Sequence, residues 1–367
     1  MRSTTTLCLG LALLLGGCAA KDRTATIAAG SAATTAALAI PPPPFDWPSE
    51  AKKVGQVPTR HVSLLNFGWP EDQRIEVKRK VSTTLGGIPQ PSNQEMSYVL
   101  TAISAAHGFR IASSDVKVIF TDKKLSERVK SAYNKTIEEL GPSLIPAFFV
   151  NQQGEFLRVE NPEQVRDDLA SMASLFEDEQ KSQVGNAQVT VNKSLKADIK
   201  VEDINSRVSG EWNTLVGLWS GLAMKDGTPF PISAPAPGDA AALTAVLPAT
   251  GTAHFAGLVA CQPGEVEKKC VALELNLATD PEALKQEINA RTKATTTSAS
   301  YSSKELFKID GASREYIARI VTEPDGLRPH RAQLIERVSI RIKVLSQNPI
   351  EFVTQQVTQL AFRYLPI

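Results

Sequence analysis

RIEVKRKVSTTL, residues 74–85, alternates apolar with charged side chains along most of its length. Successive side chains of an extended chain point to opposite faces, so an apolar residue at every second position collects on one face. The apolar face holds Ile75, Val77, Val81 and Leu85, and the opposite face holds Glu76, Lys78 and Lys80. This pattern predicts a half-buried strand of an antiparallel sheet.

The same alternation returns in the last third of the chain, at residues 271–277 (VALELNL) and 337–344 (RVSIRIKV). The run EPDG at 323–326 contains turn-forming residues and predicts the reversal of a hairpin. The stretch 353–365 is predicted to be a closing strand. We therefore expect a β-meander in the C-terminal third.

Helical periodicity appears in three places. Residues 125–140 carry apolar residues every three or four positions and end before Gly141-Pro142, which predicts a helix stop. A second helix is predicted to begin at Asn161-Pro162 and to continue to residue 176. Residues 212–219 predict a third, short helix. Each helix would lay one apolar stripe on the sheet.

The stretch 96–109 fits either a helix that ends at Gly108 or a hairpin that turns at His107-Gly108, and we favour the hairpin. The prolines between positions 229 and 237 predict an extended connector. Together these segments predict an α+β fold, a curved antiparallel β-sheet or meander with a few helices packed on one face.

Composition sets broad limits on function. The chain has 367 residues, with 40 Lys and Arg against 39 Asp and Glu. A balanced charge provides no strong field for a polyanion, so we expect no nucleic-acid partner. The length allows two domains or one large β-rich domain.

The first residues have the parts of a secretory leader. Arg2 is followed by an apolar run, LCLGLALLL at 7–15, and then by Gly16, Gly17 and Cys18. About nine apolar residues are too few for a spanning helix, which needs roughly 20. The stretch LGGC at 15–18 resembles the lipobox of bacterial lipoproteins.

The resemblance covers residues 1–18 only, and it implies a signal peptide at 1–17 and lipid on Cys18. The membrane is then a partner through this covalent lipid, which includes palmitate-type acyl chains, and the protein is held at the outer face of a cell-envelope membrane. In a Gram-negative host, Ala19 after the cysteine implies sorting to the outer membrane, with exposure to the periplasm or to the cell surface both open.

Residues 18–50 are expected to form a tether. The segment up to Ile40 is dominated by Ala, Thr, Ser and Gly, and Pro41 to Pro44 follow. Such a composition cannot bury enough apolar surface to offset the entropy of ordering. The folded region is then 51–367, either as one unit or as two halves, about 51–180 and 181–367.

No residue pattern points to catalysis. The four histidines, His61, His107, His254 and His330, show no metal-ligand spacing, and no nucleotide-binding or nucleophile motif occurs. We therefore expect no cofactor, no metal and no enzymatic activity. Trp212 and Trp219 are weak candidates for a ligand-binding platform, although packing in the core is the favoured explanation for both.

The cysteines predict a disulfide. Cys8 leaves with the leader and lipid occupies Cys18, so Cys261 and Cys270 remain. Pro263-Gly264 offers a turn between them, which would bring the two sulfurs together across the mouth of a hairpin. In an oxidising compartment such a pair closes. A redox or metal-binding pair is the alternative, disfavoured because the spacing is far from that of CxxC motifs.

Three classes of function remain. The first is a non-catalytic binding protein for an apolar ligand or a protein partner. Its expected sheet, helices and lipid anchor resemble in outline the half-barrel lipid carriers of the bacterial envelope. The second is a structural or assembly subunit of an envelope complex. The third is an enzyme whose site is built from scattered residues.

Overall fold

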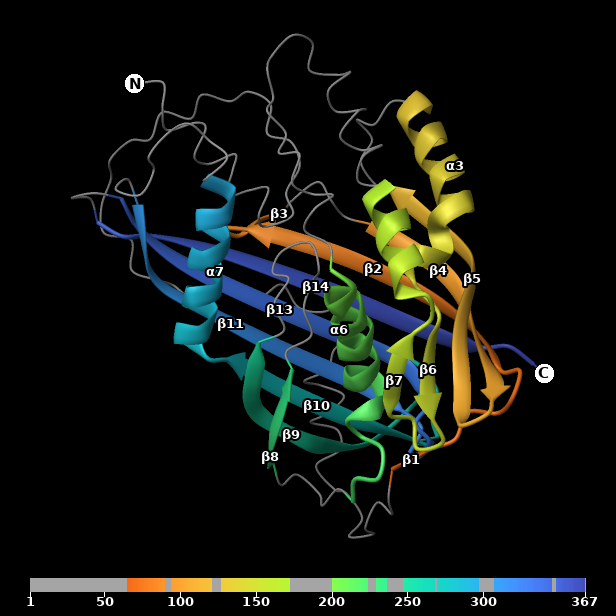
Figure 1. Ribbon diagram of the computed structural model, residues 1–367. Coiled ribbons are helices and arrows are strands. Elements are labelled where there is room, and N and C mark those ends of the chain that lie inside the picture. Colours follow the sequence, from red (N-terminus) through yellow and green to blue (C-terminus); the bar gives the residue numbers. More distant parts are fainter. Residues whose placement is uncertain are drawn as a thin grey trace.

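The computed structural model describes residues 65–89, 94–120, 127–171, 200–223, 229–235, 247–267, 269–296, 307–344 and 348–366. The leader, Cys18 and the tether lie outside these residues. In the described part, one twelve-stranded sheet dominates the molecule, and its neighbouring strands are antiparallel. Figure 1 shows the long strands running side by side across the view.

The elements follow in chain order. The strands are β1 (Asn66–Phe67), β2 (Arg74–Leu85), β3 (Ile88–Pro89), β4 (Gln94–Ala105), β5 (Gly108–Phe120), β6 (Phe148–Asn151), β7 (Phe156–Val159), β8 (Phe230–Pro235), β9 (Pro248–Val259), β10 (Cys270–Thr279), β11 (Phe307–Thr322), β12 (Asp325–Gly326), β13 (Pro329–Val344) and β14 (Ile350–Tyr364). The helices are α3 (Glu127–Leu144), α6 (Val201–Trp212), the π-helix η1 (Asn213–Gly217) and α7 (Pro281–Thr296), and residues 162–171 are also helical.

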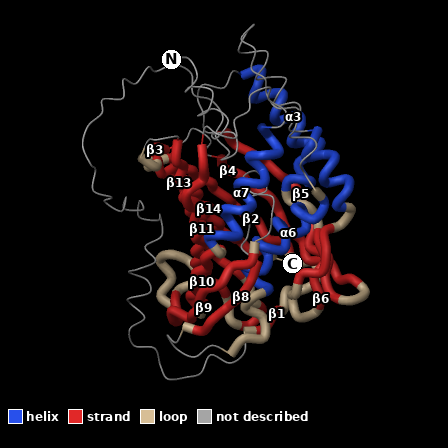
Figure 2. The backbone as a smooth tube through the Cα atoms, turned by 60° about the vertical axis from the view of Figure 1, so that its left-hand side comes forward, coloured by secondary structure: helices blue, strands red, loops and turns tan. Residues whose placement is uncertain are grey.

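The order of strands in the sheet is β7-β6-β5-β4-β2-β14-β13-β11-β10-β9-β8, with β3 beside β2. The predicted meander is present as β9, β10, β11, β13 and β14, with α7 between β10 and β11. Strands from residues 74–159 and from residues 230–364 share this sheet, because β2 pairs with β14. The tube in Figure 2 shows the strands as one layer with helices beside it.

The alternation that predicted the strands matches their burial. Ile75 and Val77 of β2 are fully buried, whereas Lys78 and Lys80 are exposed. The predicted reversal at 323–326 joins β11 to β13, with the Glu323 N–H donating to the Arg328 carbonyl at 3.1 Å. The favoured hairpin at 96–109 is correct, since β4 ends at Ala105 and β5 begins at Gly108. These are the antiparallel strands of an α+β protein.

Two helix predictions need correction. The helix predicted to stop before Gly141 continues through Pro142 to Leu144. Tertiary packing outweighs the missing N–H of proline here: Gly141 lies against Val116 of β5, and Ser143 Oγ donates to Asp168 Oδ2 at 2.5 Å. The short helix predicted over 212–219 is instead the end of α6 followed by η1.

The helix predicted to begin at Asn161-Pro162 is present, with helical residues from 162 to 171; the rest of its predicted length lies outside the described residues. The predicted proline connector is the edge strand β8 at its described residues. No described helix is both long and apolar enough to cross a membrane.

An ion pair joins β5 to the end of β7. The Arg110 guanidinium donates to both carboxylate oxygens of Glu160, at 2.9 Å from Nε and 2.6 Å from Nη2. These bonds lower the pKa of Glu160 below its ordinary value, outweighing the opposite effect of burial. The pair therefore stabilises the fold above the unfolded-state pKa of about 4.3, and this contribution is lost as pH falls through the lower folded-state pKa.

We expect Glu160→Gln to destabilise the protein near pH 7 and to become equivalent to the native chain well below about pH 4. Urea unfolding of both proteins across this range measures the difference in stability. The pair is about one-third exposed, at 34% and 29%, so its contribution is modest. A difference that stays constant with pH would contradict the assignment.

Candidate functional site

An open cavity of about 460 Å³, lined by both polar and apolar atoms, lies where three segments of the chain meet. The segments are β1, the turn between β6 and β7, and the residues that follow η1 (Figure 1). Its lining residues are Asn66, Phe67, Gln152, Gln153, Glu155, Ser220 and Gly221. Amide, carboxylate and hydroxyl groups thus surround one aromatic ring. We call this place the amide cavity.

The β6–β7 turn is held in one shape by Asn151. Its Oδ1 accepts the N–H groups of Gln153 and Glu155 at 3.0 and 2.8 Å, and its Nδ2 donates to Glu155 Oε2 at 2.6 Å. Gly154 has a φ of 80°, and a Cβ built there would lie 2.6 Å from the ring of Phe67. Only glycine lets this turn close on that ring.

Trp212 is hydrogen-bonded to the β6–β7 turn from the core side. Its ring is 5% exposed, and its Nε1–H donates to the Gly154 carbonyl at 2.7 Å. The ring packs edge-on against Trp69 and Phe148, with centroid separations of 5.3 and 5.2 Å. Trp212 is therefore an anchor for one wall of the cavity and presents no open face to a ligand.

Trp219 has a similar structural role, since it too is buried and bonded to a backbone carbonyl. It is 1% exposed, and its Nε1–H donates to the Thr214 carbonyl at 2.6 Å. The Leu218 N–H bonds to Asn213 O, the i to i+5 pattern of a π-turn, which changes the angular spacing between the two tryptophans. Both indole rings are therefore buried. They do not form the exposed ligand-binding platform for which the two tryptophans, seven residues apart, were weak candidates.

Short bonds connect the three segments. Ser220 Oγ donates to the Gln153 carbonyl at 2.5 Å, while the Gly221 N–H and the Leu65 carbonyl meet at 2.7 Å. The Asn66 N–H donates to the Pro324 carbonyl, and β1 pairs in parallel with β12. Because its walls are tied together, the cavity is preformed.

A second polar cluster is buried beneath α6. Arg79 Nη1 donates to Glu211 Oε2 at 2.8 Å, and Arg314 Nε donates to Glu336 Oε1 at 2.6 Å. Arg314 is 1% exposed. Tyr316 is also buried, and desolvation raises its pKa well above the ordinary value. Such a network within the core makes the stability of the sheet depend on each member.

Cys261 and Cys270 form a disulfide, as predicted. The sulfurs close the mouth of the β9–β10 hairpin, where Cys261 lies just past the end of β9 and Cys270 begins β10. Both cysteines are buried in a small apolar cluster with Val259, Ala272 and Val321. The disulfide cross-links the two arms of the β9–β10 hairpin at one end of the sheet.

His330 lies beside the disulfide in a hydrogen-bonded group. Its Nε2 is 2.8 Å from Glu323 Oε1, its Nδ1 is 3.3 Å from Gln262 Nε2, and Arg328 bonds to the other oxygen of Glu323. Burial raises the pKa of Glu323, but the bond from His330 and the charge of Arg328 outweigh it, so the net shift is downward. The carboxylate stays ionised and accepts from both neighbours.

Comparison with known proteins does not assign the chain to a family. No family model matches the chain, and no curated protein matches its sequence. The functional argument therefore rests on the residues themselves.

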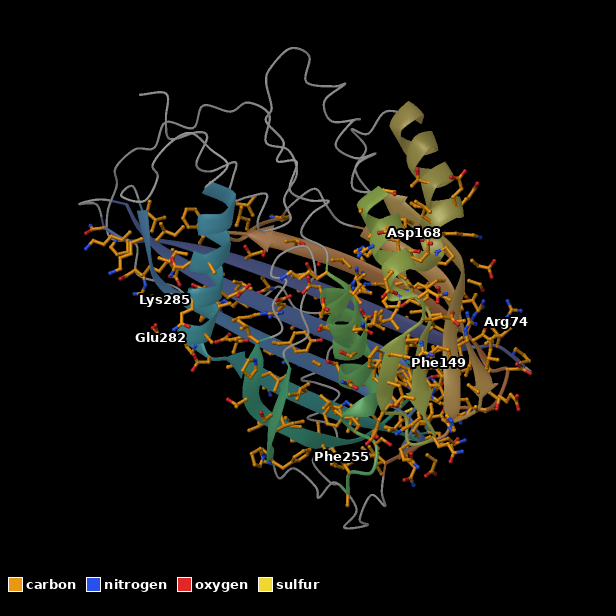
Figure 3. The ribbon with its side chains drawn as sticks, viewed as in Figure 1. Arg74, Phe149, Asp168, Phe255, Glu282 and Lys285 are labelled. Atoms are coloured by element: carbon orange, nitrogen blue, oxygen red, sulfur yellow. A yellow bond between two sulfur atoms is a disulfide. The ribbon has the colours of Figure 1, made fainter. Side chains whose placement is uncertain are left out.

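The sequence pointed to the two tryptophans but not to the cavity that they support. Figure 3 shows the crowded side chains of the sheet and its helices, with Phe255 of β9 in the buried apolar cluster and Phe149 of β6 half-buried beside Arg158. The signal available in the sequence was the run NQQGE at 151–155, a glycine among polar residues that is typical of a tight turn. Nothing local indicated that residues 66–67 and 220–221 would meet it.

Proposed function

We propose that this protein is a cell-envelope lipoprotein, anchored by lipid on Cys18, whose folded part binds a protein partner without catalysis. The support for the anchor is the LGGC stretch after an apolar leader. The observation that carries the binding role is the amide cavity, whose hydrogen-bonded walls bring amide, hydroxyl and carboxylate groups together.

The chemistry of the cavity favours a peptide segment. Asn66, Gln152 and Gln153 each offer a donor and an acceptor, which matches the alternating N–H and C=O groups of a backbone. The volume of about 460 Å³ falls in the usual range for binding pockets, roughly 300–1,000 Å³. An extended loop of a partner protein is a ligand of this kind.

An apolar ligand is less well supported. The carrier hypothesis needs an apolar cleft between the sheet and its helices. In the described part, apolar side chains including Trp212, Leu215 and Val216 of the α6–η1 segment pack there against strand residues in one continuous cluster. The space that the hypothesis would leave for a lipid is occupied at these residues.

We further infer that the helices share one face of the sheet. Leu284 and Ile288 of α7 pack on Val338 and Ile340 of β13. Arg79 of β2 reaches Glu211 of α6, and its position alternates with those of the exposed Lys78 and Lys80. The face that bears Lys78 and Lys80 would then be turned away from the helices.

Cys18→Ser is expected to abolish lipid attachment. Without the thiol no diacylglycerol can be transferred to this position, so the precursor would remain unprocessed. Metabolic labelling with a radioactive fatty acid, followed by gel separation, measures this directly. The native chain serves as the positive control, and normal labelling of Cys18→Ser would refute the lipobox interpretation.

Partner binding is tested by detergent pulldown with mass spectrometry of both protein and lipid fractions. Gln152→Arg places a long cation at the amide cavity, and we expect loss of at least 90% of the stoichiometric partner. Gln286→Arg is the matched control, because Gln286 is an exposed residue of α7. An apolar ligand in the organic extract with no protein partner would contradict the proposal, as would equal capture by both variants.

A further inference from the structure

The sulfurs of Cys261 and Cys270 and a ring nitrogen of His330 all lie within 4.8 Å of one another. Three donors of these types form the protein part of many zinc sites, with bond lengths of about 2.3 Å to sulfur and about 2.0 Å to nitrogen. Around a tetrahedral ion such donors are about 3.5–3.8 Å apart. For one ion to bind all three donors, the sulfurs must therefore move apart and the ring nitrogen must move closer, each by about 1 Å.

The contacts of His330 favour the form that can bind a metal. The amide nitrogen of Gln262 is a donor, so the Nδ1 that faces it at 3.3 Å accepts through its lone pair, and a metal ion would take the place of this hydrogen bond. The ionised Glu323 is an acceptor, so the Nε2 at 2.8 Å carries the proton. Gln262, the partner of Nδ1, directly follows Cys261 in the chain.

Glu323 supplies the usual support for such a ligand. Metal-bound histidines almost always donate their other N–H to a carboxylate, carbonyl or water, which fixes the ring and raises its basicity. Glu323 is itself held by Arg328. Glu323 thus already occupies the position of the carboxylate that accepts a hydrogen bond from a metal-bound histidine.

The surroundings also suit thiolates. Arg331 Nη2 donates to the Ala260 carbonyl at 3.2 Å, so a guanidinium lies next to Cys261. A nearby cation favours the thiolate over the thiol. Of the two cysteines, Cys261 is the more accessible, at 7% exposed against 0% for Cys270.

We propose that reduction of the Cys261–Cys270 disulfide converts this corner into a zinc site formed by both sulfurs and Nδ1 of His330. The reductant is a dithiol. One of its thiolates attacks a cysteine sulfur and breaks the S–S bond, and its second thiol then releases the mixed disulfide. Two electrons and two protons pass to the protein, and the reductant leaves as a cyclic disulfide. Binding of Zn²⁺ displaces the two thiol protons to solvent.

The site is a switch between two cross-links. In the oxidised protein a covalent bond closes the hairpin mouth, and in the reduced protein an ion closes it and extends the cross-link to β13. Zinc therefore restores the constraint that reduction removes. This inference concerns the corner at His330 and does not depend on the lipid anchor or on the amide cavity.

The test uses the full chain purified in detergent, reduced with dithiothreitol without oxygen and then freed of reductant. Co²⁺ is added as the spectroscopic probe, and Zn²⁺ is titrated to displace it. We expect one Co²⁺ per reduced chain with a thiolate-to-cobalt absorption band, and no such band for the oxidised chain. Cys8 and Cys18, where a sample retains them as thiols, are the same in every variant, so the reduced Cys261→Ser/Cys270→Ser chain measures their contribution.

Variants identify the ligands. We expect Cys261→Ser/Cys270→Ser to lose the band and His330→Ala to lower the affinity at least 100-fold. Glu323→Gln should lower it by about 10 to 100-fold, the usual effect of an outer-group change. His107→Ala is the matched control, since His107 lies exposed in the β4–β5 turn.

Three results would overturn the proposal. They are no band in the reduced native chain, equal binding by the oxidised chain, and unchanged affinity in His330→Ala. The oxidised native protein is the folded non-binding reference, so a double cysteine variant that fails to fold leaves the other comparisons decisive.

Discussion

Trp212→Ala is expected to lower the free energy of unfolding by about 3–5 kcal/mol, the range for removing a large aromatic side chain from a core. The ring contacts Trp69 and Phe148, and its loss would also leave the Gly154 carbonyl without its indole donor. Urea unfolding followed by far-ultraviolet circular dichroism measures the change.

Trp212→Phe separates the two effects, because it keeps most of the packing and removes only the N–H donor. We expect a smaller loss, about 1–3 kcal/mol for a buried acceptor left unsatisfied. Gln286→Ala on the exposed side of α7 should stay within about 0.5 kcal/mol. A loss below about 1 kcal/mol for Trp212→Ala would show that the indole is not an anchor of the cavity wall.

Arg314→Met is expected to destabilise the protein by about 3–5 kcal/mol, because it leaves the Glu336 carboxylate at a mostly buried position without its guanidinium. Arg314 and Glu336 are 1% and 14% exposed, so water screens the pair little. Glu336→Leu should produce a loss of similar size for the complementary reason. Urea unfolding of both single variants measures these losses.

The double variant Arg314→Met/Glu336→Leu should lose less than the sum of the two single variants, because no charge then stays unpaired. The double-mutant cycle yields the coupling between the two side chains. Purely additive losses would mean that the ion pair is not an energetic unit.

Local patterns predicted the long strands well. Alternation at 74–85, 271–277 and 337–344 corresponds to β2, β10 and β13, because burial of one face imposes a period of two on the sequence itself. The turn residues at 323–326 likewise encode their own hairpin. These features need information from only a few neighbouring residues.

The missed features depend on distant partners. The short strands β6 and β7 carry too few residues for a period to show, and among the side chains of α7 that the structure describes, Leu284 and Ile288 are the two in its apolar cluster. Helix α3 passes Pro142 because β5 packs against it. The amide cavity and the His330 corner each combine segments far apart in the chain, and no local pattern records which segments will meet.

The place of β14 in the sheet sets the order in which the fold can be completed during synthesis. This strand lies between β13 and β2, and just beyond it the Leu365 carbonyl accepts a bond from Gln73 Nε2, 292 positions earlier. Until residues 350–364 have left the ribosome, β2 and β13 each lack this neighbour. The incomplete chain therefore has two unpaired inner strand edges until these last residues are added.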